Sequence, residues 1–174
     1  MLNQSFYREL YESDQASPEC VNNCPASQVI KEQLWKKECE KKFAFGWQLS
    51  QSFYAGAEFY RRANQKNLAV FMLHQSAEHA LKTILRVHMR YVLEIHLIDY
   101  LLRSAALYSL QLRDVFKPSD PGDQKLLRIL DNAYLDARYS YDFQVCDNEL
   151  SILTERIKCI HIVLQDIWKQ INKE

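Results

Sequence analysis

Two rows of polar side chains in this sequence could carry chemistry. The first contains His74, Glu78 and Lys82, which recur every four residues within LAVFMLHQSAEHALKTIL at 68–85. On a helix this spacing places them on one face, beside an apolar stripe. The row could be an exposed ladder in which Glu78 and Lys82 stabilise the helix surface. It could equally lie at the lip of a groove, where His74 and Glu78 would orient a ligand.

The second row contains Asp131, Tyr134 and Arg138, with Tyr139 next to it, in LDNAYLDARYSYDF at 130–143. An arginine flanked by tyrosines can bind a phosphate through its guanidinium group while the rings stack on a base. The alternative is a structural ion pair between Arg138 and an aspartate, which would tie the end of this helix to a neighbour. The sequence leaves both interpretations open.

Arg90 and His96 lie at the expected turn between two helices and form a third candidate pair. A catalytic histidine needs a partner that orients it, and no partner is adjacent to His96 in the sequence. We expect His79 and His161 at the surface or at the edge of the core. Neither a phosphate-binding glycine loop nor a G-x-S-x-G element occurs, so the sequence does not support the common enzyme classes that use them.

The composition limits the possible partners. Lysine plus arginine equal aspartate plus glutamate at 22 each, so no global positive field attracts nucleic acid, although a local patch could. The cysteine count of five is odd and the N-terminus has no apolar segment, which predicts reduced thiols in a cytoplasmic protein. Cys20 and Cys24 lack a second close pair, so we predict no metal site. No apolar run is long enough to predict a membrane span.

The elements that must position these residues are helices. With three glycines and four prolines the chain has too few turn residues for an all-β fold. We expect a polar tail or linker over 1–26 and one domain over 27–174. Apolar periodicity predicts helices at about 28–63, 67–90, 95–112 and 121–139, and one from about 147 onward. The fold class is therefore all-α, an up-and-down bundle of four to five antiparallel helices.

Several details of these helices are predicted as well. Gly46 should kink or break the first helix, and Asn67 should cap the second. Asp120 should cap the fourth, with Pro121 in its first turn. The third helix is apolar around most of its circumference, so we expect it centrally or at a dimer contact. The last helix has the most regular apolar spacing, with steps of three and four at Leu150, Leu153, Ile157, Ile160, Leu164, Ile167 and Ile171.

Three motifs together resemble the HEPN family of α-helical domains. They are F-x-L-H-Q-S-A-E-H-A-L-K at Phe71 to Lys82, I-H-L at 95–97 and A-Y-L-D-A-R-Y at 133–139. The resemblance covers about residues 45–165. Their order and spacing are similar to the bacterial branch that is paired with, or fused to, a minimal nucleotidyltransferase.

The resemblance implies an HEPN-like bundle that forms homodimers and binds RNA or a nucleotide such as ATP, in company with a nucleotidyltransferase. The expected ligand-binding residues are His74, Glu78, Lys82, Asp131, Tyr134, Arg138 and Tyr139. Many members are ribonucleases or toxins with an arginine four to six residues before a histidine. No histidine follows Arg138 in this way, whereas Arg90 and His96 fit the spacing. We therefore expect a noncatalytic binding module. The alternatives are a metal-independent endoribonuclease toxin of a toxin–antitoxin pair and a plain interaction scaffold.

Overall fold

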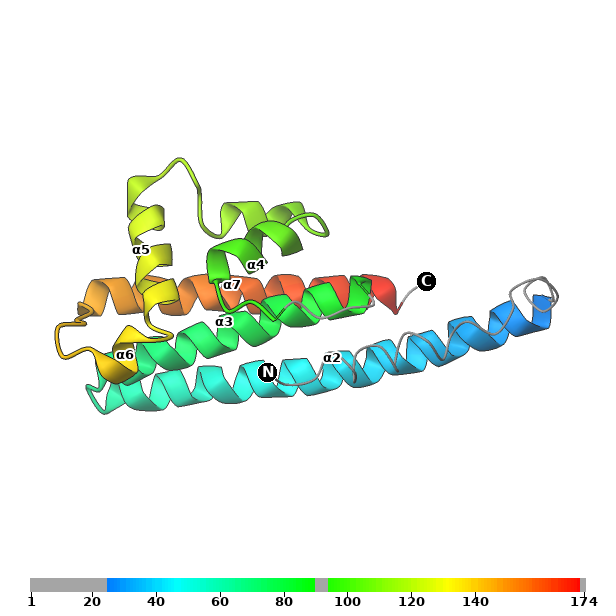
Figure 1. Ribbon diagram of the computed structural model, residues 1–174, viewed down its shortest axis with the longest axis horizontal. Helices are drawn as coiled ribbons and strands as arrows, with labels where there is room; N and C mark the ends of the chain where they lie inside the picture. Colours follow the sequence, from blue (N-terminus) through cyan, green and yellow to red (C-terminus); the bar gives the residue numbers. More distant parts are fainter. Residues whose placement is uncertain (1–24, 90–93, 173–174) are drawn as a thin grey trace, which may run out of the picture. The chain divides into compact units, whose positions relative to one another are not determined.

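The computed structural model describes residues 25–89 and 94–172, with side chains from residue 32 onward. All regular secondary structure in these ranges is helical, which confirms the predicted all-α bundle (Figure 1). The chain divides into two units, residues 1–38 and 39–174; the described part of the first is the start of α2. The predicted tail over 1–26 lies almost wholly outside the described residues. The elements are α2 (Pro25–Arg62), α3 (Lys66–His88), α4 (Ile98–Ala105), the 3-10 helix η1 (Leu110–Asp114), α5 (Pro121–Asn132), α6 (Asp136–Tyr139) and α7 (Asp147–Ile171).

Helix α3 is central in the unit formed by residues 39–174, since it contacts α7, α4, α5 and α6. The stacking of Phe53 on His79 and the approach of Cys39 to Val87 show that α2 runs antiparallel to α3. In contrast, α3 and α7 run in the same direction, because Lys66 and Asp147 form an ion pair at their two starts. The segment that contains α4 to α6 returns the chain to the end of the bundle where α3 begins (Figure 1).

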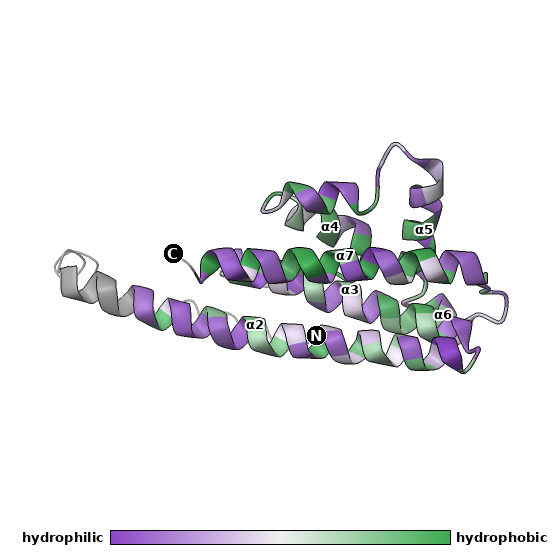
Figure 2. Cartoon of the chain, turned by 180° about the vertical axis from the view of Figure 1, so that it is seen from behind, coloured by the Kyte–Doolittle hydropathy of each residue, from purple (hydrophilic) through white to green (hydrophobic). Residues whose placement is uncertain are grey.

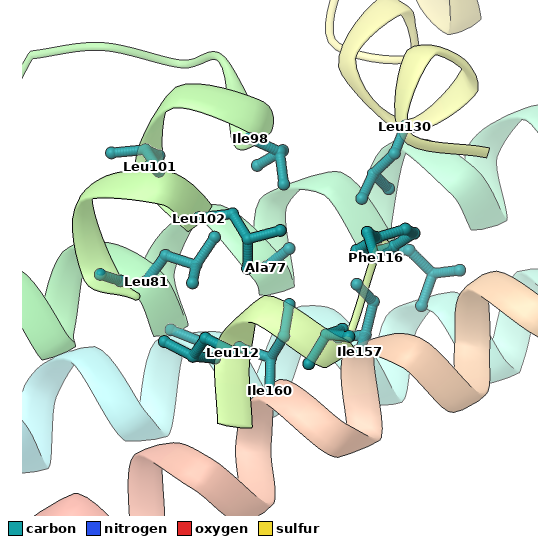
Figure 3. Packing of buried hydrophobic residues seen from close by; sticks show 14 of the residues in the cluster. Ala77, Leu81, Ile98, Leu101, Leu102, Leu112, Phe116, Leu130, Ile157 and Ile160 are labelled. Carbon is teal, nitrogen blue, oxygen red and sulfur yellow. The ribbon is translucent and has the colours of Figure 1, made fainter. Parts of the chain in front are cut away.

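The predicted apolar seam of α7 is confirmed. Leu153, Ile157, Ile160 and Leu164 are fully buried, and α7 alternates between hydrophobic and hydrophilic colours along its length (Figure 2). Figure 3 shows Ile157 and Ile160 packed in the core with residues of α3, α4, η1 and α5. Each such side chain contributes roughly 1.5–3 kcal/mol through burial. This shared core holds the shorter helices against α3 and α7.

The predicted third helix, 95–112, is wrong in its bounds. Helix α4 ends at Ala105, and η1 begins only at Leu110. Ile98, Leu101, Leu102 and Ala105 turn one face of α4 into the core, whereas the Leu107 and Leu110 side chains are 72% and 69% exposed. The prediction failed because apolar residues continue past the end of the buried face, and composition alone does not show where burial stops.

The predicted helix 121–139 is also divided, because α5 ends at Asn132 and α6 begins at Asp136. Its predicted start is confirmed: the Asp120 carboxylate accepts hydrogen bonds from the backbone N–H groups of Gly122 and Asp123, at 2.7 and 3.1 Å. The predicted cap at Asn67 is wrong. Helix α3 begins one residue earlier, and the Asn67 amide donates to the Phe143 carbonyl instead, at 2.7 Å.

Gly46 does not break α2, so the expected break is wrong. The helix continues through it, and a Cβ atom added at this position would lie 1.9 Å from Oγ1 of Thr83. The glycine therefore has a packing role: its missing side chain lets the backbone of α2 approach α3 at Thr83.

Candidate functional site

The row of His74, Glu78 and Lys82 lies in the interior of the protein. All three residues are buried, which rules out the exposed ladder as an interpretation. Lys82 Nζ donates to Glu78 Oε1 at 2.8 Å, so the expected pair forms, but in an environment of low polarity. Unpaired charges cost several kcal/mol in such surroundings. Each polar atom of the row therefore has to find its partner within the protein.

Glu78 is the acceptor at the centre of this cluster. Its Oε1 accepts from Lys82 and also from Nδ1 of His96 at 3.1 Å, while its Oε2 lies 3.4 Å from Nε2 of His74. Burial by itself would raise the pKa of Glu78. Hydrogen bonds from His74, Lys82 and His96 outweigh burial and lower the pKa to about 2. The carboxylate is therefore ionised at neutral pH.

His74 connects this carboxylate to α5. Its Nδ1 lies 2.9 Å from the carbonyl oxygen of Leu130, and because a carbonyl only accepts, Nδ1 carries a proton. Its Nε2 faces Glu78 Oε2, and neither atom has another hydrogen-bond partner among the described residues. The Nδ1 hydrogen bond therefore holds the ring against α5, while the other edge of the ring faces the Glu78 carboxylate.

His96 is the exposed member of the cluster, with 49% of its side chain accessible. Its ring stacks on Tyr134, with the centroids 4.6 Å apart and the planes 10° from parallel. Since the ionised Glu78 only accepts, Nδ1 of His96 carries the proton in their hydrogen bond. The second ring nitrogen, Nε2, then remains to exchange a proton with a ligand. A histidine held in this way by a carboxylate is the arrangement that general acid–base catalysis uses.

Arg138 approaches the same tyrosine. Its Cζ lies 5.0 Å from the ring centroids of Phe71 and of Tyr134, and 5.1 Å from that of Tyr139. Its Nε and Nη2 donate to the backbone carbonyl of Tyr134, at 2.9 and 2.5 Å. The predicted ion pair with an aspartate is not found among the described residues, where Nη1 has no partner. Tyr139, which is 75% exposed, lies beside it.

Asp131 has a structural partner. Its Oδ1 accepts from the backbone N–H of Ile98 at 2.5 Å, so it caps the first turn of α4 from α5. Burial raises the pKa of Asp131, and the N–H groups of Ile98 and Asp99 oppose this rise. Because His96 lies two residues before Ile98, this cap also anchors the segment that carries His96.

The structure thus brings six of the seven predicted ligand-binding residues into direct contact with one another or with His96. Tyr134 joins the two rows, since its ring stacks on His96 and lies 5.3 Å from that of His74. Asp131 lies one residue beyond the Leu130 carbonyl that His74 binds, and contacts the α4 backbone. Arg90 lies outside the described residues. We call the group of His74, Glu78, Lys82, His96, Tyr134, Arg138 and Tyr139 the His96 cluster.

A second buried polar network was missed by sequence reasoning. His161 Nδ1 lies 2.9 Å from the Gln51 amide nitrogen, and His161 Nε2 lies 2.8 and 3.0 Å from the hydroxyls of Ser50 and Ser76. The two hydroxyls donate to each other's backbone carbonyls. His161 is therefore a neutral ring that accepts at Nδ1 and donates at Nε2. Burial lowers its pKa to about 4.

This network ties α2, α3 and α7 together, and its Ser50, Ser76 and His161 members are buried, so its role is structural. His161 was expected at the surface or the core edge, and this expectation is wrong. The available signal was the position of Ser50 on the same helical face as Phe43, Gly46 and Ala57, all of which are buried.

The described residues contain no group of three or more His, Cys, Asp or Glu side chains that could hold a metal ion. None of the helices that the structure describes has the length and hydropathy to cross a membrane. Cys20 and Cys24 lie outside the described range.

Comparison with known proteins agrees with the fold and with the motifs of the His96 cluster. No curated protein matches the chain. The family model of the HEPN domain matches residues 47–170, a range that contains every residue of the cluster and most of the helical bundle. The chain therefore belongs to the HEPN domain family.

Proposed function

We propose that the protein binds RNA or a nucleotide at the His96 cluster. The observation that carries this proposal is the contact of His96 and Arg138 with one tyrosine, Tyr134. Because the two groups lie 4.6 and 5.0 Å from the same ring centroid, a single short ligand can contact both. Arg138 offers Nη1 to a phosphate, and the exposed Tyr139 ring offers a surface for base stacking.

Helix α3 supports this surface from below. Glu78 is held by Lys82, so it presents a fixed acceptor to His96, and the Arg138 guanidinium group lies over the Phe71 ring. A preorganised site of this kind loses little entropy when a ligand binds. We propose that the row of His74, Glu78 and Lys82 is the buried support, and that Arg138 and Tyr139 of the second row form the exposed contact surface.

Fluorescence anisotropy with a labelled single-stranded RNA, and with ATP as competitor, tests this proposal. We expect Arg138→Gln and Tyr139→Ala each to weaken RNA binding about tenfold, in line with the ~1–3 kcal/mol typical of one stacked base. Lys169→Gln is the matched control, because Lys169 is an exposed cation on α7 whose partner is Asp166. The absence of binding to both RNA and ATP, or an equal loss in the control, would overturn the proposal.

A second candidate function is cleavage of RNA at the same cluster. It is favoured by the hydrogen bond between Glu78 and His96, which orients the imidazole and leaves Nε2 for proton transfer. As a base, Nε2 would remove the proton of a ribose 2′-hydroxyl, whose oxygen then attacks the adjacent phosphorus. The 5′-oxygen leaves and takes up a proton, and a 2′,3′-cyclic phosphate is formed. A cation such as Arg90 or Arg138 would stabilise the charge on the phosphorane oxygens.

Cleavage and binding alone are separated by His96→Gln. If the protein is a ribonuclease, this variant binds the labelled RNA but leaves it intact, whereas the unmodified protein cleaves it with EDTA present. A substrate with 2′-deoxyribose at the cleaved position should also stay intact. If the unmodified protein leaves the RNA intact, binding is the function and cleavage is refuted.

We also propose that the protein forms a homodimer and has a nucleotidyltransferase partner, as in the bacterial branch that the motifs resemble. The dimer is supported by the exposed leucines that follow α4, Leu107 and Leu110. Sedimentation equilibrium should show a dimer that L107K/L110K converts to a monomer. Co-expression with a nucleotidyltransferase encoded beside it should yield a complex; a lone monomer in both experiments would contradict these partners.

A further inference from the structure

A cavity formed by the described residues lies apart from the His96 cluster, none of whose members lines it. It has a volume of about 570 Å³ and lies between α4, η1 and α5. This volume falls in the ~300–1,000 Å³ range of small-molecule sites. The apolar side chains that line it come from all three elements and the residues next to them. They are Leu102, Ala106, Leu112, Phe116 and Leu127. Leu102, Leu112 and Phe116 also belong to the core drawn in Figure 3, so this wall is anchored by packing behind it.

The acidic side chains that line the cavity are all paired, whereas several of the basic ones are not. Asp99 is paired with Arg103. Asp123 is buried and accepts from Arg156 and from the backbone N–H of Lys117, at 2.9 Å each. Asp131, as described above, is occupied by the N–H of Ile98. All three carboxylates that line the cavity therefore already have donors.

Three cations at the rim have no such partner. The side chains of Arg113, Lys117 and Arg128 line the cavity, are exposed, and have no hydrogen bond or ion pair with any residue that the structure describes. Two of the three are arginines, whose planar guanidinium groups match carboxylate and phosphate oxygens in pairs. The cavity thus combines a largely apolar interior with a positive entrance.

The geometry points to this cavity as a binding site for an amphipathic anion, a small molecule with an apolar body and one carboxylate or phosphate head. The body would occupy the space against Leu112 and Phe116, and the head would pair with Arg113 and Arg128 at the rim. This arrangement buries the apolar surface and keeps the anion at the positive entrance, near solvent. A cation with the same body would meet repulsion there.

Isothermal titration calorimetry with three ten-carbon probes tests the site, each used below its micelle-forming concentration. The probes are decanoate, decyl phosphate and decyltrimethylammonium. We expect one molecule of an anionic probe to bind per chain, at least tenfold more tightly than the cation. Comparison of decanoate with decyl phosphate shows which head group is preferred. Equal affinity for the anions and the cation, or no binding of any probe, would overturn the proposal.

Two variants locate the binding. R113Q/R128Q removes rim charges without touching the core, and should weaken anion binding about tenfold or more. Ala106→Phe should abolish binding by filling the cavity, with circular dichroism as the check that it folds. K158Q/K169Q, which removes two positive charges from the exposed face of α7, is the charge-matched control and should bind as the unmodified protein does. Unchanged anion binding in R113Q/R128Q would refute the ligand site. The site would also be refuted if no anion binds and Ala106→Phe instead dissociates a dimer, because the cavity would then belong to a dimer contact.

Discussion

Glu78 holds His96 across a sequence separation of 18 residues, with 3.1 Å between Oε1 and Nδ1. One residue is buried in the middle of α3, and the other is half exposed in the segment before α4. The buried carboxylate therefore fixes the orientation of an imidazole at the surface. This relationship supplies the partner that His96 lacks in its own sequence neighbourhood, and it connects the stability of the core to the geometry of the candidate site.

Replacement of Glu78 by glutamine should strongly destabilise the fold. The change removes the charge that pairs with Lys82 and leaves a buried cation without compensation, which typically costs about 3–5 kcal/mol. Urea denaturation measures the free energy of unfolding. Glu155→Gln is the control, since Glu155 pairs with Lys158 at the exposed surface and should have no measurable effect. Equal stability of the two variants would show that the Glu78 cluster does not support the core.

The network around His161 predicts a loss of stability in mild acid. The folded state lowers the pKa of His161 to about 4 from the 6.5 of a free histidine, so the unfolded state binds the proton more readily between these pH values. The free energy of unfolding should therefore fall as the pH is lowered from about 6.5 to 4. A shift of this size corresponds to roughly 3 kcal/mol.

The contribution of His161 is isolated by comparison with His161→Gln, which has no titrating ring. The difference in unfolding free energy between the unmodified protein and this variant should decrease from pH 7 to pH 4. Protonation of Glu78 should also lower the free energy of unfolding, but at lower pH. Because its pKa falls from 4.5 in the unfolded state to about 2 in the folded state, its stabilising contribution is lost between these two pH values. A difference that is constant with pH would contradict the assigned role of His161.

Two glycines in α2 should respond to alanine in opposite ways. At Gly46 the new methyl group would meet Thr83 Oγ1, and this overpacking should cost about 1–3 kcal/mol despite the better helix propensity of alanine. At Gly56 the nearest atom is the flexible Met72 Sδ at 3.4 Å, so Gly56→Ala should be neutral or stabilise by up to about 1 kcal/mol. Thermal denaturation of both variants gives the comparison. A double variant with Thr83→Ala should recover part of the loss at Gly46.

Asp131→Ala should loosen the segment that carries His96. Loss of the hydrogen bond to Ile98 removes the cap of α4, at a cost of about 0.5–2 kcal/mol. Hydrogen exchange should accelerate in residues 94–99, and RNA binding should weaken. Asp120→Ala is a matched control, because it removes the cap of α5 without a contact to the His96 segment. If both variants change exchange in residues 94–99 equally, Asp131 has no specific role there.

The sequence alone determined those features that depend on short-range patterns. The alternating steps of three and four residues marked α7, and Asp120 followed by Pro121 marked the start of α5. The polar spacing of His74, Glu78 and Lys82, together with the A-Y-L-D-A-R-Y motif, indicated the family that the comparison confirms. Helical periodicity shows which residues share a face, and capping depends on neighbouring residues only. Both can therefore be predicted from the sequence without knowledge of the fold.

Only the tertiary structure decided what covers each face. Periodicity does not show that the His74 row is buried, that His96 returns to Glu78, or that α4 ends where its buried face ends. Gly46 seemed a helix breaker because its neighbour Thr83 is 37 positions away in the sequence. The serines at 50 and 76 meet His161 for the same reason: a contact between distant segments depends on how three helices pack together, and a single helical pattern carries no record of its partners.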